Sequence, residues 1–229
     1  MATHFDATAA GGVSRAVNER AHVDSNIPQL VVVGGPSCVG KSTLLDRLAR
    51  GEMPCLAESI GLSGAPELTI VHAAELKTRR QWPAAGPVLL HYELTRTRFL
   101  QGWAAADNAL ALLRRANRLD FLTLWEQPDE MHRRFEAKFK NAIVADLRRL
   151  RLGRASRVLR RYRLRRPYFV DRDKMWKLYC QWFEVCDAFE ASRHWVFRSG
   201  ELDCRPELLH RVKNSRFPPW EGKRPPSGW

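Results

Sequence analysis

The stretch VVVGGPSCVGKSTLL, residues 31–45, decides the fold of this chain. It holds Gly35 and Gly40 five positions apart, with Lys41 and Ser42 directly after them. A β-branched run precedes the glycines and an amphipathic segment follows them. Glycines let a backbone curl until consecutive N–H groups point at one anion, and the next helix adds the positive end of its dipole. The spacing therefore predicts a buried strand, a phosphate-binding loop and a helix.

The predicted loop implies a specific chemistry. We expect Lys41 to reach the terminal phosphates of a nucleoside triphosphate, ATP or GTP, and the Ser42 hydroxyl to complete the shell of a Mg²⁺ ion. The alternative is a purely structural Gly-rich turn that joins a strand to a helix and binds nothing. The expected nucleotide-binding residues are consecutive: Gly35, Pro36, Ser37, Cys38, Val39, Gly40, Lys41, Ser42 and Thr43.

The chain of 229 residues fits one α/β domain with additions at both ends. Residues 1–28 are rich in small and polar residues, and we expect a flexible N-terminal tail there rather than a secretion signal. Residues 29–214 would form the nucleotide-binding domain, and residues 215–229 an irregular Pro-rich tail.

Cysteine usage and hydropathy bear on the compartment. The five cysteines are odd in number and scattered, which fits a reducing, cytoplasmic location and neither a disulfide framework nor a zinc site. No segment approaches the roughly 18 consecutive apolar residues of a transmembrane helix. A membrane is therefore the least expected partner, and the oligomeric state stays open.

Strand signals recur at intervals that suit a parallel sheet with crossover helices. We expect strands near residues 29–34, 68–72, 88–92, 120–125 and 194–197, and helices between them. This predicts an α/β fold, a three-layer sandwich around a mostly parallel five-stranded sheet with right-handed crossovers. Ligands bind such sheets at the carboxyl ends of the strands, where Gly35, Glu93 and Glu126 fall.

Three further helical regions are expected. Residues 128–166 have a basic helical pattern, which Gly153 would break or bend and Pro167 would end. Residues 171–192 carry a dense apolar set that implies a helix packed on the sheet. A shorter helix is predicted near residues 205–212.

Acidic and basic residues beside the expected strand ends are the candidates for chemistry. Glu93 ends an apolar run, so we expect it to hold Mg²⁺ or its waters, or to orient an acceptor hydroxyl. Glu126 is the weaker candidate, and His91 is more simply a hydrogen-bonded core residue. Arg96 and Arg98 follow Glu93 and could grip an anionic substrate or remain ordinary surface arginines.

The order of these parts resembles the P-loop kinase superfamily of the P-loop NTPase fold, which includes the nucleoside monophosphate kinases. The resemblance covers roughly residues 29–209. It implies that Lys41 and Glu93 act in phosphoryl transfer and that residues 127–166 form a basic, helical, lid-like insertion. Arg133 and Arg134, or a cation among residues 138–154, would then neutralise the transferred phosphate. The turn at residues 195–200 is similar to the base-contacting loop of that family.

One departure from the family concerns the acceptor. The stretch Glu93-Leu94-Thr95-Arg96 lacks the Asp-Gly-Phe-Pro-Arg shape of adenylate kinases, so the acceptor is expected to differ from AMP. No motif for a substrate-base pocket identifies it.

The net charge of +13 is concentrated in one segment, since residues 133–166 hold 14 Lys and Arg and only two acids. The segment could be a lid that attracts anionic substrates, a nucleic-acid surface, or an amphipathic helix on an anionic membrane. In the membrane interpretation the side chains facing lipid would be Leu147, Leu150, Val158 and Leu159.

These features favour an ATP-dependent kinase that acts on a small-molecule acceptor. The alternative is a nucleic-acid-associated NTPase or polynucleotide-end kinase that docks through the basic segment. A sulfotransferase-like enzyme is disfavoured by the complete Gly-Lys-Ser ending of the loop. A nucleotide-dependent switch is disfavoured because no Asn-Lys-x-Asp stretch is present.

Overall fold

Strand β1 (Gln29–Gly34) is the centre of the sheet, and each of its residues after Gln29 is buried. It pairs in parallel with β3 (Pro87–His91) on one side and β4 (Leu119–Trp125) on the other, so that Val32 lies opposite both Leu90 and Phe121. A strand covered on both faces needs a continuous apolar run, which explains the sequence of β1. The computed structural model describes residues 27–63, 68–73, 86–95, 112–189, 193–200 and 207–208.

The described strands form one sheet in the order β2-β3-β1-β4-β5-β6. Strands β2 (Thr69–His72) and β5 (Arg193–Arg198) complete the parallel part, which confirms the expected α/β fold with five parallel strands. The short β6 (Glu207–Leu208) pairs antiparallel with β5. The helix predicted near residues 205–212 is therefore wrong at these two positions, because the backbone there satisfies its hydrogen bonds against the open edge of β5.

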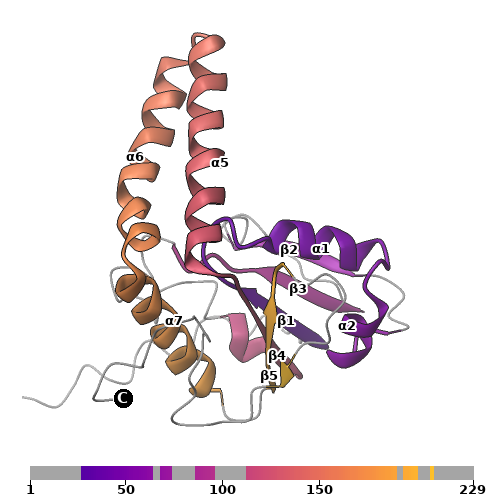
Figure 1. Ribbon diagram of the computed structural model, residues 1–229. Helices are drawn as coiled ribbons and strands as arrows, with labels where there is room; N and C mark the ends of the chain where they lie inside the picture. Colours follow the sequence, from indigo (N-terminus) through magenta and orange to yellow (C-terminus); the bar gives the residue numbers. More distant parts are fainter. Residues whose placement is uncertain are drawn as a thin grey trace, which may run out of the picture.

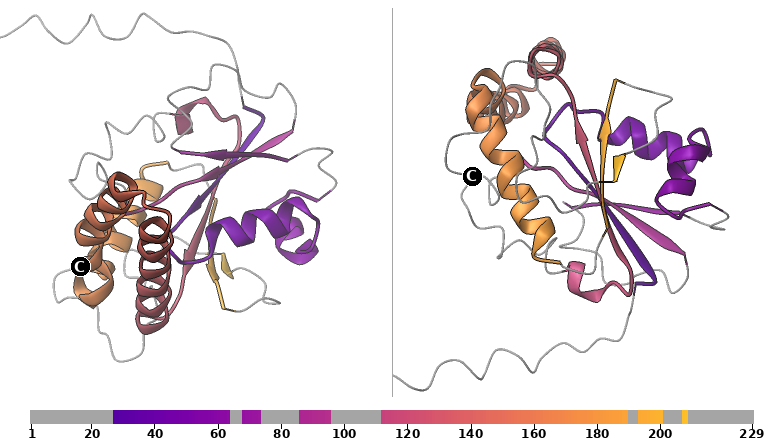
Figure 2. Two further views of the ribbon diagram at one scale, coloured as in Figure 1. Left: turned by 90° about the horizontal axis from the view of Figure 1, so that it is seen from above. Right: turned by 60° about the horizontal axis from the view of Figure 1, so that its bottom comes forward.

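Helices lie on both faces of the sheet (Figure 2). On one side are α1 (Lys41–Ala49) and α2 (Pro54–Ser59), and on the other is α7 (Arg172–Asp187). The 3₁₀ helix η3 (Leu112–Arg115) precedes β4. This layering is compatible with the expected three-layer sandwich. The folded part begins before Gln29, since Ile27 is fully buried and forms a bridge with Ala116.

Helices α5 (Pro128–Arg148) and α6 (Leu152–Val170) form a long hairpin that projects away from the sheet (Figure 1). Aromatic rings join its two helices: Phe135 stacks on Phe169 with ring centroids 4.1 Å apart and on Tyr162 at 5.5 Å. Because these contacts lie between the helices, each helix buries a face that it could not cover alone.

The boundaries of this hairpin differ from those expected. The turn falls at residues 149–151 rather than at Gly153, and α6 continues through Pro167 to Val170. The helical hairpin therefore extends beyond residue 166, where the sequence predicted its end. A proline lacks one backbone N–H, and packing of the last turn of α6, where Phe169 is buried, offsets that loss.

The helix predicted at residues 171–192 is α7, which begins where expected. The Asp171 side chain accepts hydrogen bonds from the backbone N–H groups of Asp173 and Lys174 and so caps the helix. The apolar face of α7 lies on the sheet, and Trp182 is fully buried there. In the described part of the chain, no helix combines the length and apolar character needed to cross a membrane.

Candidate functional site

The loop between β1 and α1 lies at the carboxyl end of the central strand. Gly40 occupies the N-cap of α1 with φ 97°, a conformation that favours glycine. Cys38 also has a positive φ, 67°, which is uncommon for a residue with a side chain and occurs often at binding loops. The first residue of α1 is Lys41, so the loop brings a lysine, a helix N-terminus and curled backbone together.

Lys41 is only 3% exposed and its side chain lies back over the loop. Its Nζ donates to the carbonyl oxygens of Gly35 (2.8 Å) and Pro36 (2.6 Å), and it lies 3.4 Å from Oε2 of Glu93. Burial lowers the pKa of Lys41, and the neighbouring carboxylate opposes that effect. The structure thus brings together the two residues that the sequence assigned to phosphoryl transfer.

Glu93 follows β3 and is held as a carboxylate. Thr95 donates to its Oε1 through both its hydroxyl (2.5 Å) and its backbone N–H (3.3 Å). Burial opposes ionisation of Glu93, but Lys41, the Thr95 hydrogen bonds and Arg165 outweigh it, so the pKa lies below its ordinary value.

A magnesium ion would have few protein ligands at this loop. In the described part of the chain, no three His, Cys, Asp or Glu residues lie close enough to hold a metal among themselves. The donors available are the Ser42 hydroxyl and the Glu93 carboxylate. This set fits Mg²⁺, which keeps several waters and takes its remaining oxygens from substrate phosphates, and does not fit a dedicated protein cage.

His91 lies at the end of β3, beside the start of α1. Its Nε2 is 3.5 Å from the Ser42 hydroxyl, and its ring centroid is 4.8 Å from that of His72 at the end of β2. Burial and the charge of Lys41 lower the pKa of His91 to about 4. The imidazole is therefore neutral near pH 7 and can accept a hydrogen bond from a hydroxyl group.

A cation that the sequence did not single out reaches the loop from α6. Arg165 donates from Nη1 to the hydroxyl of Ser37 (3.2 Å), and its charge contributes to the lowered pKa of Glu93. From α5, the charge of Lys138 acts on both Cys38 and Lys41. Burial raises the pKa of the Cys38 thiol, although the charges of Lys138 and Lys41 oppose that shift, and the raised pKa keeps the thiol from being a ready nucleophile.

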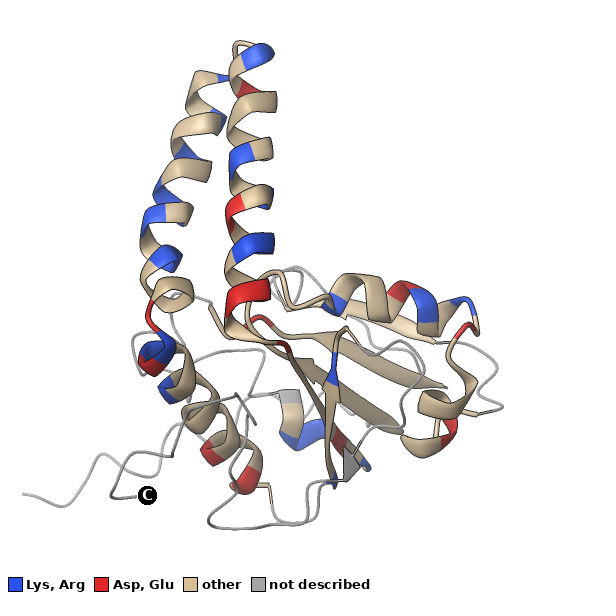
Figure 3. Ribbon diagram, viewed as in Figure 1, with Lys and Arg blue, Asp and Glu red and all other residues tan. Residues whose placement is uncertain are grey.

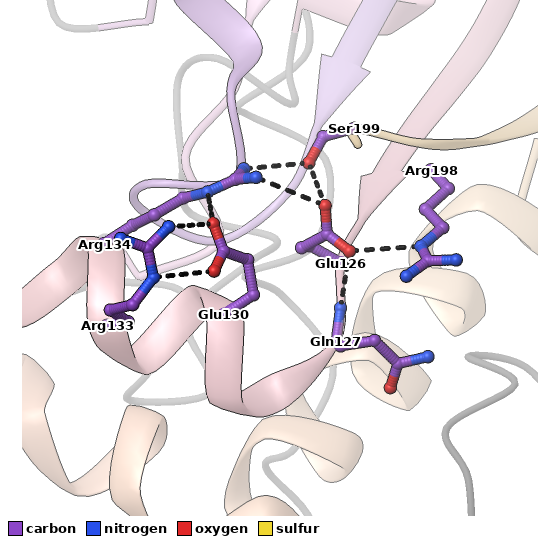
Figure 4. A network of polar contacts seen from close by, with 7 residues as sticks. All are labelled: Glu126, Gln127, Glu130, Arg133, Arg134, Arg198 and Ser199. Carbon is purple, nitrogen blue, oxygen red and sulfur yellow. Dashed lines mark hydrogen bonds and ion pairs between the residues drawn. The ribbon is translucent and has the colours of Figure 1, made fainter. Parts of the chain in front are cut away.

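The two arginines assigned to the lid lie in a different network (Figure 4). Arg133 is 73% exposed at its side chain and pairs with Glu130. Arg134 contacts Glu130, the Ser199 hydroxyl (3.2 Å) and Glu126 (3.4 Å). The buried Glu126 also pairs with Arg198 at 3.1 Å, so it joins the ends of β4 and β5 to the first turns of α5.

A small cavity of about 120 Å³ opens beside this network. Its walls come from the start of α1, the ends of β4 and β5, and α5. Its lining combines aliphatic and aromatic side chains with four polar ones, those of Thr43, Arg47, Arg134 and Ser199. The cavity is lined by Gly40, Thr43, Leu44, Arg47, Met53, Leu124, Arg134, Phe197 and Ser199. It adjoins the turn that the sequence assigned to base contact.

Two proposed substrate residues, Arg96 and Arg98, lie outside the described residues. Among the residues that sequence reasoning missed, Thr95 lies two positions after Glu93 and could have been suspected from that position. Arg165 is one of 14 cations in its segment, and no local pattern distinguishes it. Neither a scan against models of protein families nor a search of curated proteins found a match to this chain.

Proposed function

We propose that this chain is an ATP-dependent phosphotransferase of the P-loop kinase superfamily that acts on a small-molecule acceptor. The observation that carries the proposal is the buried Lys41 at the N-terminus of α1, whose Nζ lies 3.4 Å from the carboxylate of Glu93, just after the adjacent strand β3. A lysine at that place can bind the phosphates, and a carboxylate beside it can hold Mg²⁺.

Nucleotide binding would rearrange the lysine. Its Nζ now donates to two loop carbonyl groups, Gly35 and Pro36. A phosphate carries more charge than a carbonyl, so an incoming triphosphate would draw the ammonium group from these carbonyls to its own oxygens. The backbone N–H groups at the start of α1 would bind the same phosphates.

Mg²⁺ would be held by the Ser42 hydroxyl, by phosphate oxygens and, directly or through water, by Glu93. The ion would neutralise charge on the phosphates. The chain itself would mostly position the reactants and stabilise charge.

The cations that act on the transferred group are best assigned to the hairpin base. Arg165 already contacts the loop through Ser37, and Lys138 lies close enough to act on Lys41. The exposed Arg133 is satisfied by Glu130 instead. We therefore assign phosphate neutralisation to Arg165 and Lys138, and assign Arg134 to the cavity wall, where the nucleotide base would stack.

The deciding experiment is calorimetric titration of the protein with Mg·ATP, followed by turnover with a panel of small acceptors. Lys41→Ala is expected to weaken binding at least about tenfold and to abolish turnover, since the loop loses its only side-chain cation. Lys174→Ala removes an exposed lysine of α7 and serves as the matched control. Thermal unfolding of each variant checks that it is folded. Equal ATP binding by a folded Lys41→Ala protein would contradict the proposal.

The alternative, a nucleic-acid-dependent NTPase, is supported by the charge of the hairpin. The aromatic residues of the hairpin support this alternative less, because they pack against one another instead of facing a bound nucleic-acid strand. They are Phe135, Phe139, Tyr162 and Phe169. The same turnover assay includes single-stranded and duplex nucleic acid at two salt concentrations. Stimulation that fades with salt would favour this alternative.

A further inference from the structure

The turn of the α5–α6 hairpin has an unusual surface. Residues 147–154, here called the hairpin tip, read Leu-Arg-Arg-Leu-Arg-Leu-Gly-Arg, and all eight are exposed. The tip lies at the far end of the hairpin from the sheet (Figure 1). Leu150 is 84% exposed and Leu152 is 66% exposed, so neither side chain contributes a packed contact to the fold.

Exposed large apolar side chains are concentrated on this hairpin. In the ranges that the structure describes, every large hydrophobic residue classed as exposed belongs to α5, α6 or their turn. These residues are Val144, Leu147, Leu150, Leu152, Leu159, Leu164 and Val170. The members that gather at the hairpin tip, Leu147, Leu150 and Leu152, form a group that is typical of a contact surface rather than of ordinary scatter.

Leu150 also destabilises the fold through its backbone conformation. It follows the C-cap of α5 with φ 53°, in a left-handed conformation that usually belongs to glycine. The N–H groups of Leu150 and Arg151 donate to the carbonyls of Leu147 (2.9 Å) and Asp146 (2.8 Å), the hydrogen bonds of a Schellman motif. A leucine at this position brings strain and no burial, which points to a role outside folding.

The leucines of the tip alternate with arginines. Arg154 lies 3.5 Å from Asp146, and the described residues offer Arg148, Arg149 and Arg151 no ion pair of their own. Figure 3 shows basic positions along both helices, with few acidic ones on the outer half of the hairpin. The tip is therefore both apolar and strongly cationic.

We propose that the hairpin tip docks on an anionic membrane surface. The leucines would enter the boundary between headgroups and acyl chains, while the arginines would contact lipid phosphates. Nucleic acid would pair with the arginines but would leave the leucines in water. An anionic bilayer satisfies both groups, and so explains the leucine that strains the turn. This inference does not depend on the proposed phosphotransferase activity.

The experiment is sedimentation of the full chain with vesicles of phosphatidylcholine alone or with about 30% phosphatidylserine. The wild type is expected to bind only the anionic vesicles, and binding should weaken as salt rises. The variant Leu147→Ser/Leu150→Ser/Leu152→Ser should lower the partition coefficient about tenfold or more, because it removes the apolar contribution and keeps every charge. Thermal unfolding of each protein checks that the hairpin remains folded.

The matched control is Leu164→Ser/Val170→Ser, which removes two exposed apolar side chains from α6 near the hairpin base. Leu164 is 12 residues from Leu152, or about 18 Å along a helix, so the control should bind vesicles like the wild type. Failure of the wild type to bind anionic vesicles would overturn the proposal, as would equal binding by the tip variant. Binding of duplex DNA without vesicle binding would make nucleic acid the partner of the tip. A dimer that dissociates in the tip variant would make a second copy of this chain the partner.

Discussion

At the scale of single residues, Arg165 is a cation of α6 that the fold places against the loop between β1 and α1. It comes from the second helix of the hairpin, yet it contacts Ser37 of the loop and favours ionisation of Glu93. A phosphoryl group in transfer carries its charge on equatorial oxygens, and in the proposed reaction a cation beside that group would stabilise the transition state more than the ground state.

Arg165→Ala is therefore expected to lower the turnover number of the proposed reaction about 100-fold and to weaken Mg·ATP binding much less. Arg165→Lys should recover part of the loss, since it keeps the charge but not the planar guanidinium. The measurement is steady-state kinetics with the acceptor that the panel identifies. Arg163→Ala, an exposed change two residues away on the same helix, should have little effect. A similar loss in both alanine variants would mean that Arg165 has no special role.

At the scale of elements, the contact between β1 and α7 limits the size of the side chain that fits at the end of the central strand. A Cβ atom at Gly34 would lie 2.6 Å from Cζ2 of Trp182. Trp182 is fully buried and donates from its indole nitrogen to the hydroxyl of Thr123 (2.8 Å), so it cannot move without losing that bond. Glycine at this position is a packing requirement.

Gly34→Ala should therefore lower the free energy of unfolding by about 2 kcal/mol, through overpacking against Trp182. Urea denaturation followed by circular dichroism measures this change. Gly153→Ala is the control, because a Cβ there meets nothing within 4 Å, and it should leave stability equal or slightly raised. Wild-type stability in Gly34→Ala would show that α7 can shift away from the strand.

A substitution in the turn of the hairpin is expected to raise the free energy of unfolding instead. Leu150→Gly removes a left-handed leucine whose side chain is almost wholly in water, so it should raise the free energy of unfolding by about 1 kcal/mol. The same urea titration tests it. Lower stability in this variant would indicate that Leu150 packs against the hairpin in solution.

At the scale of the whole molecule, burial of histidine makes stability depend on pH. His194 of β5 lies between the sheet and α7, and its Nε2 is 2.6 Å from the Thr123 hydroxyl. Burial lowers the pKa of His194 from 6.5 to about 3. The folded state therefore resists the proton that the unfolded chain binds below pH 6.5, and stability falls as pH drops from there toward 3.

For His194 alone, the loss between pH 7.5 and pH 4.5 should be about 2–3 kcal/mol. Urea titrations of the wild type and of His194→Gln across this range measure it. The variant lacks the titrating group, so its stability should fall less steeply, and the gap between the two proteins should narrow toward low pH. Parallel pH profiles would show that His194 binds a proton as readily in the folded state as in the unfolded chain.

The main architecture follows from local patterns in the sequence. The run Val31–Val33, the glycine spacing and the helix after it predict strand, loop and helix in turn, and each later apolar run became a parallel strand. Lys41 and Glu93 could be expected at one edge of the sheet, because the carboxyl ends of parallel strands meet there. Local periodicity also predicted long basic helices after β4.

What the sequence by itself determined is thus the loop between β1 and α1, the five parallel strands, and the placement of Lys41 and Glu93 at one edge of the sheet. Only the tertiary structure decided which cation reaches the loop, because Ser37 and Arg165 are 128 positions apart and meet only when α6 folds back along α5. It also decided that Arg134 joins Glu126 and that the leucines of the hairpin tip stay in water. A side chain's environment depends on all the elements packed around it, whereas local pattern records only the residue's own element.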